Sequence, residues 1–349
     1  MKQGTLSSFL KRAPPRIHFC CDGNGKASFL VSPPKNYARI GEARVGLSKT
    51  KRTVYLELWR EREAVEEDPA ECRPGCTDLA LMQSNLQKAV RRGLGRSAQQ
   101  TALEMAHCKG GFASLCRRMP IIALEDVGTA DRDLVTCVWL MLAVSTKGCD
   151  YRPRPRDFEF VQRYALALAR HGVHEENDGV DEGERCSKRR KTSVSGCVWS
   201  SADARGDHVA MALLVRAAYG GMRCDVEMLE EEGAKDQSSA PELITSNAFL
   251  NQKVQSTRLT RENMLPAAVD FHVDATMARK LHSSLPRAKQ GNWTEDDIKA
   301  AIWAKSSSVN VRKAAGDGSM ERLEGLWWSI QAELCSLQNQ RIRRAFPCR

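Results

Sequence analysis

Residues 116–131 of this chain read CRRMPIIALEDVGTAD, and they predict a helix that ends at a corner. The pair Arg117 and Arg118 with the apolar residues that follow has the spacing of a helix with one basic and one apolar face. Gly128 offers the positive φ that ends a helix. Asp131 lies where the next helix needs an N-cap. The stretch therefore indicates two helices joined by a tight turn.

Helical periodicity continues on both sides of this corner. Upstream, apolar residues recur at helical spacing from Leu79 to Val90, with Asp78 as a possible cap. Further helices are predicted over residues 98–106, 112–124, 133–145, 158–171 and 209–218. Another begins at a cap formed by Thr294 and Asp297, and the last begins at about Ser319 and carries an apolar stripe from Leu323 to Leu337.

Strand signals are confined to the N-terminal part of the chain. Residues 27–31 and 53–59 are rich in β-branched and aromatic side chains, and two prolines interrupt the sequence between them. The expected fold class is therefore mainly α, with multi-helical domains and a small β-containing N-terminal segment. The predicted organisation is a disordered tail at 1–16, a β-containing segment at 17–66, a helical domain at 77–172, a disordered acidic and basic linker at 173–200, and a C-terminal helical domain at 201–349.

The composition indicates a soluble intracellular chain. Its 349 residues are 42% hydrophobic and 28% charged, and no apolar run approaches the roughly 18 residues that span a bilayer. We expect no membrane segment and no secretory signal. The 13 cysteines are an odd number, which argues against a disulfide framework. The net charge of +10 permits a polyanionic partner without requiring one.

The corner also carries a family resemblance. Residues 86–92, LQKAVRR, together with residues 116–131 resemble the helical region that follows the ATPase core in the RarA/MgsA family, which includes the eukaryotic Werner-helicase-interacting ATPase. The matching residues are Lys88, Val90, Arg91, Arg117, Arg118, Ala123, Glu125, Asp126, Val127, Gly128, Ala130 and Asp131. The resemblance covers about residues 84–150 and implies a role at stalled replication forks.

The ATPase core of that family has no counterpart in this sequence. The best P-loop candidate, GNGKAS at residues 23–28, lacks the first glycine and has Ala27 where Ser or Thr would bind Mg²⁺. The segment before Leu86 is also too short for an AAA+ core. We therefore expect no nucleotide cofactor and, more generally, no enzymatic activity.

The acidic residues of the corner allow two interpretations. Glu125, Asp126, Asp131 and Asp133 are explained by caps and ion pairs with Arg117, Arg118 or nearby helix ends. The alternative is a carboxylate cluster of a Mg²⁺-dependent nuclease spanning Glu125 to Asp133. The structural interpretation is favoured, because no lysine or histidine base accompanies the acids.

Four residues have the chemistry of zinc ligands. Cys72 and Cys76 are separated by a turn-forming Pro-Gly pair, and His107 and Cys108 follow downstream. A single half-site of this kind is weak. We expect a cysteine-containing loop without a metal, and zinc remains the alternative.

The first residues of the chain form a short apolar motif. Gln3, Leu6, Phe9 and Leu10 have the spacing of a one-turn plug and are followed by basic residues. The motif resembles the PIP-box, the peptide that docks replication and repair proteins on the sliding clamp PCNA, although Leu10 replaces the usual second aromatic residue. An organelle transit peptide, directing the chain to a mitochondrion or plastid, and a tail without function are the alternatives.

Two further clusters bear on location and binding. The basic run Lys188, Arg189, Arg190 and Lys191 beside an acidic stretch predicts a nuclear localisation signal read by a nuclear import receptor, or else a solvated charge run. The tryptophans and arginines of the C-terminal third could stack bases. Tryptophans at helical spacing favour a core or helix interface instead.

The favoured functional hypothesis is a non-enzymatic nuclear protein of DNA replication or repair, tethered to PCNA, whose helical domains bind DNA or other replisome proteins.

Overall fold

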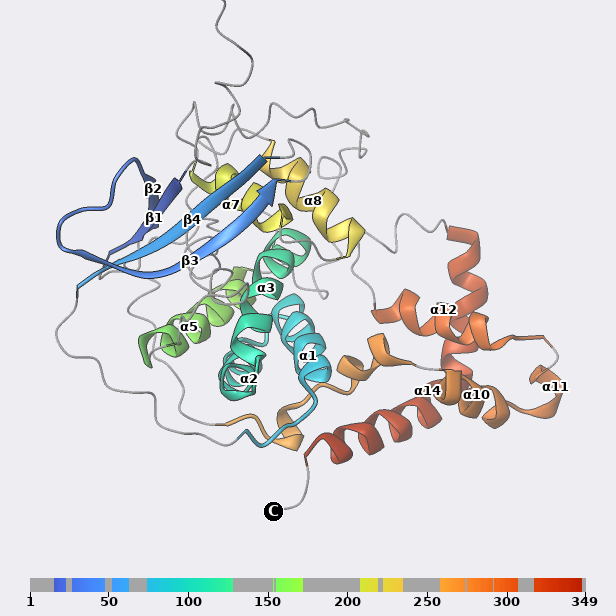
Figure 1. Cartoon of the computed structure of the whole chain (residues 1–349). Helices are drawn as coiled ribbons and strands as arrows, with labels where there is room; N and C mark the ends of the chain where they lie inside the picture. Colours follow the sequence, from blue (N-terminus) through green and yellow to red (C-terminus); the bar gives the residue numbers. More distant parts are fainter. Residues whose placement is uncertain are drawn as a thin grey trace, which may run out of the picture. The chain divides into compact units, whose positions relative to one another are not determined.

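The described part of the chain is mainly helical and carries one small four-stranded mixed sheet near the N-terminus (Figure 1). The computed structural model describes residues 16–22, 27–47, 52–62, 74–127, 153, 155–171, 208–218, 222–234, 258–273, 275–290, 292–306 and 317–346. The predicted fold class is confirmed.

The chain divides into two compact units. The first comprises residues 1–68, 131–154 and 191–246, and the second comprises residues 69–130, 155–190 and 247–349. Each unit therefore gathers segments that are far apart in sequence. The segment bounds proposed from the sequence remain predictions.

Among its described residues, the first unit contains the sheet and two helices. Its strands are β1 (Arg16–Cys21), β2 (Ala27–Leu30), β3 (Tyr37–Leu47) and β4 (Arg52–Glu61), and its helices are α7 (His208–Ala218) and α8 (Arg223–Gly233). The strand order is β2-β1-β4-β3, with β1 parallel to β4 and the other neighbours antiparallel. The strands predicted at 27–31 and 53–59 are β2 and β4.

The sheet has one apolar face because its inward residues alternate along the strands. Leu56 and Leu58 of β4 are completely buried, and Phe19 of β1 lies in register with Leu58. The Phe19 ring contacts Phe29 of β2, with centroids 5.0 Å apart. The residues between these positions, including Glu57, must point to the opposite face.

The second unit contains the remaining helices. They are α1 (Leu79–Arg91), α2 (Gly95–His107), α3 (Gly111–Ile122), the π-helical turn η2 (Ala123–Val127), α5 (Pro155–His171), the short helices η4 (Arg261–Asn263) and η5 (Pro266–His272), α10 (Ala275–Ser284), α11 (Arg287–Gln290), α12 (Glu295–Ser306) and α14 (Asp317–Ala345). The predicted helix over residues 133–145 and the predicted linker over 173–200 lie outside the described residues.

Two predicted helix caps are present. The Asp78 carboxylate accepts a hydrogen bond from the Leu81 amide at 3.0 Å and so starts α1. Thr294 and Asp297 form a reciprocal capping box at the start of α12: the Asp297 amide donates to Thr294 Oγ1 at 3.1 Å, and the Thr294 amide donates to Asp297 Oδ2 at 2.8 Å.

Two apolar clusters support the second unit. The first surrounds α1, whose Leu81, Leu86 and Val90 are buried against α2, α3 and α5. The second lies among α10, α12 and α14. Its buried residues are Leu281, Leu285, Ile298, Ala301, Ile302, Leu326, Ile330, Leu334 and Leu337. The stripe predicted on the last helix is therefore its core face.

Gly111→Ala should destabilise the second unit. The turn from α2 into α3 brings the chain so close that an added Cβ would lie 2.0 Å from the Met105 carbonyl oxygen and 2.8 Å from Cys108 Cβ. Relief requires backbone movement, and we expect a loss of about 1–3 kcal/mol in the free energy of unfolding, measured by urea denaturation.

Gly325→Ala is the matched control. Gly325 lies inside α14 with nothing within 4 Å of the added Cβ. The same substitution should raise stability there by about 0.5–1 kcal/mol, because glycine is a poor helix former. Equal effects of the two substitutions would contradict the packing described for Gly111.

Candidate functional site

The described acids of the corner are bound by the chain's own polar side chains. Arg91 Nε donates to Asp126 Oδ1 at 2.8 Å, and both side chains are almost fully buried. Gln87 Nε2 donates to Glu125 Oε2 at 2.7 Å and to Asp126 Oδ2 at 3.0 Å. Arg118 donates to the Gln87 amide oxygen. This network ties α1 to α3 and to the π-helical turn, which supports the structural interpretation.

The other corner residues and the two short motifs lie outside the described part. Gly128, Asp131 and Asp133 follow the end of the π-helical turn. The motif Gln3, Leu6, Phe9 and Leu10 and the basic run Lys188, Arg189, Arg190 and Lys191 also fall on residues that the structure does not describe. Their roles stay predictions.

The described cysteine and histidine candidates are engaged in packing. Burial raises the pKa of Cys76 to about 12 and that of Cys108 to about 11, which disfavours the thiolate that a metal needs. The ring of His107 stacks on Phe158 at 4.8 Å, and its Nδ1 lies 2.8 Å from the Leu103 oxygen. Cys72 lies outside the described residues. These contacts favour a cysteine-containing loop.

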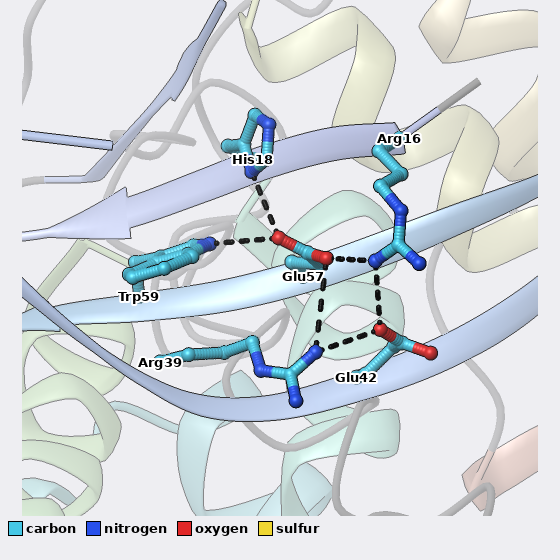
Figure 2. Close-up of polar contacts among 6 residues, drawn as sticks. All are labelled: Arg16, His18, Arg39, Glu42, Glu57 and Trp59. Atoms are coloured by element: carbon cyan, nitrogen blue, oxygen red, sulfur yellow. Dashed lines mark hydrogen bonds and ion pairs between the residues drawn. The ribbon is translucent and has the colours of Figure 1, made fainter. Parts of the chain in front are cut away.

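A polar cluster occupies the second face of the sheet, and Figure 2 shows its six residues converging from β1, β3 and β4. Glu57 at its centre is 5% exposed. Its carboxylate accepts hydrogen bonds from Arg16 and, at 3.2 Å, from Trp59 Nε1. His18 Nδ1 lies 3.1 Å from Glu57 Oε2, and Arg39 Nη1 lies 3.7 Å from Oε1.

A second carboxylate completes this cluster. Glu42 Oε2 accepts hydrogen bonds from Arg16 Nη1 at 3.1 Å and from Arg39 Nη1 at 2.9 Å. Two guanidinium groups therefore face two carboxylates. Burial alone would raise the pKa of Glu57. The hydrogen bonds from Arg16 and Trp59, with the charges of His18 and Arg16, outweigh burial and hold that pKa below its ordinary value. The cluster therefore balances its own charge and stabilises the sheet.

A cationic cleft of about 610 Å³ in the second unit has a different charge balance. It lies between the start of α1, the first half of α10 and the end of α14. The Thr77 amide donates to the Ala345 carbonyl at 3.0 Å, which fixes the end of α14 beside α1. Its charged lining residues are three cations, Lys280, Arg341 and Arg344, and one acid, Asp78.

The tryptophans of the C-terminal third are divided between core and surface. Trp293 and Trp327 pack against the second apolar cluster, and the Arg322 guanidinium lies 4.9 Å from the centroid of the Trp293 ring. These two agree with the core interpretation. Trp303 and Trp328 are exposed, and none of the four lines the cleft.

Comparisons with known proteins give no guide to the function of this chain. No protein-family model matches the chain, and neither a curated protein nor a solved structure was found to be similar to it. The resemblance of residues 84–150 to the RarA/MgsA family therefore stays a prediction.

No group of three or more His, Cys, Asp or Glu side chains in the described segments is arranged to hold a metal ion. No helix within those segments combines the length and apolarity needed to cross a membrane.

Asp126→Ala should lower the free energy of unfolding rather than remove a catalytic activity. The substitution leaves the buried Arg91 guanidinium without this carboxylate, and we expect the free energy of unfolding to fall by about 3–5 kcal/mol in urea denaturation. An Arg91→Met/Asp126→Leu variant should recover part of that loss, because it removes both charges. Mg²⁺-dependent DNA cleavage that disappears in a still-folded Asp126→Ala chain would instead favour the nuclease.

Glu57→Gln should weaken the sheet in a pH-dependent manner. A carboxylate whose pKa is lowered by folding adds stability above its unfolded pKa, near 4.5, and this stability is lost as the pH falls through the folded pKa. We expect a deficit of about 1–3 kcal/mol at pH 7 that shrinks below about pH 4.5, measured by urea denaturation from pH 3 to 7. Glu61→Gln on the same strand is the control, with an expected change within about 0.5 kcal/mol.

Proposed function

We propose that this chain is a non-enzymatic accessory protein of DNA replication or repair, tethered to the PCNA sliding clamp and binding DNA with its helical part. Gln3, Leu6, Phe9 and Leu10 form the tether. Residues 188–191 are its nuclear localisation signal, read by a nuclear import receptor.

The N-terminal motif is the observation that carries this proposal. A single helical turn places Leu6, Phe9 and Leu10 on one side, where they can fill an apolar pocket on a partner. Gln3 supplies a polar anchor three residues earlier, and Lys11 with Arg12 favours an acidic partner surface. A segment this short has no core of its own, so its apolar side chains have most to gain from docking.

The corner network supports the non-enzymatic part of the proposal. Glu125 and Asp126 are the described members of the acidic group that a nuclease would use, and Gln87 and Arg91 already bind them. Metal binding would have to displace a buried ion pair, which costs several kcal/mol.

Binding of the full chain to purified PCNA tests the tether. Leu6→Ala/Phe9→Ala should weaken binding at least about tenfold in isothermal titration calorimetry, because truncated apolar anchors cost more than about 1 kcal/mol each. Ser7→Ala/Ser8→Ala in the same peptide is the control and should bind like the native chain. Equal affinity of the native chain and the Leu6→Ala/Phe9→Ala variant would exclude the tether.

Processing of the N-terminus distinguishes the transit-peptide alternative. N-terminal sequencing of the protein recovered from its native cells should find Gln3, Leu6 and Phe9 retained. Removal of about the first twenty residues would destroy the motif and place the protein in an organelle.

A further inference from the structure

The cationic cleft contains two positive charges that have no partner among the described residues. Within the described part of the chain, Lys280 and Arg344 make no hydrogen bond or ion pair, and both are exposed. Arg341 differs, since its Nη2 lies 3.5 Å from Asp78 Oδ2. Asp78 is itself occupied as the cap of α1. The lining of the cleft therefore carries a net positive charge, which favours an anionic ligand.

The cleft has features beyond charge that make it a binding site. Its position is fixed, because the Thr77 amide and hydroxyl both donate to the Ala345 carbonyl. Leu337, a member of the second apolar cluster, forms part of the lining together with Met277. A cleft whose lining includes both apolar and cationic side chains can hold a ligand that carries both apolar atoms and negative charge.

We propose that this cleft binds the sugar–phosphate backbone of a single DNA strand, an inference that rests on the proposed function for the choice of DNA among polyanions. Arginine binds phosphate oxygens in a forked geometry, and lysine adds a point charge. The sugars contact the apolar lining residues Met277 and Leu337. A volume of about 610 Å³ is that of a small-ligand pocket, so one strand enters it rather than a duplex.

Binding at this site is independent of base sequence. None of the described residues that line the cleft is aromatic, so they offer bases no stacking platform there. Arg343, exposed in the last turn of α14, continues the positive charge beyond the cleft. An extended chain of closely spaced phosphates can contact this charge and the cleft together.

Fluorescence anisotropy with a labelled thirty-nucleotide oligothymidine and the full chain tests the proposal. Lys280→Glu/Arg344→Glu should weaken binding at least about tenfold in 100 mM NaCl, and the slope of log affinity against log salt should become shallower by roughly 1.4. Lys280→Gln/Arg344→Gln should give a smaller loss in the same direction. Both residues are exposed, so circular dichroism should show unchanged folding.

Lys109→Glu/Arg287→Glu is the matched control. It reverses one lysine and one arginine that are exposed in the same unit and do not line the cleft. An equal loss of affinity in this control would mean that net charge alone explains the effect, and it would overturn the proposed binding site. Undiminished binding by the Lys280→Glu/Arg344→Glu variant would overturn it as well.

Competitors identify the ligand class. A thirty-base-pair duplex should compete less well than the unlabelled single strand, and polyglutamate of equal charge should compete poorly. Displacement by polyglutamate as effective as by oligothymidine would assign the cleft to an acidic peptide and overturn the proposal. Leu6→Ala/Phe9→Ala should leave oligothymidine affinity unchanged, so failure of the clamp tether and failure of the cleft are measured separately.

Discussion

The second unit depends on a helix that is buried together with its polar residues. From Leu81 to Arg91, α1 is enclosed by other helices, yet Asn85, Gln87 and Arg91 are all hydrophilic. Buried polar groups destabilise a fold unless each has a hydrogen-bonding partner. Those partners therefore determine what packs around α1.

The buried polar residues of α1 bind three other segments of the chain. Asn85 Nδ2 donates to Thr101 of α2 at 2.7 Å, while its Oδ1 accepts from the Leu265 amide at 2.8 Å. Gln87 and Arg91 bind the acids of the π-helical turn. A chain segment some 180 positions away thus docks on α1 through one amide side chain. Together with the hydrogen bond from Thr77 to Ala345, this contact joins residues 247–349 to α1 within one compact unit.

Local signals in the sequence predict many of the helices and strands, but they do not predict which of these pack together. The caps at Asp78 and Thr294 and the stripe on α14 depend on residues three or four apart, and all are present. Strands β1 and β3 were not predicted. β1 has a short mixed sequence, and β3 contains charged residues, two glycines and a register shift between Arg39 and Gly41, so neither shows clear alternation. Lys280 and Arg344 come from separate helices, and no spacing along the chain predicts that they share a cleft.

The balance of charge separates the structural sites from the binding site. In the corner, Arg91 is paired with a carboxylate, and on the sheet two arginines face two glutamates. A cation paired inside the fold has little free energy left to offer a ligand, because binding would first have to break the pair. Lys280 and Arg344 carry no such cost, since neither makes a hydrogen bond or ion pair within the described part of the chain. Among the described residues, Lys280 and Arg344 therefore bring to one cleft two cations that can bind an anion without first breaking an internal ion pair.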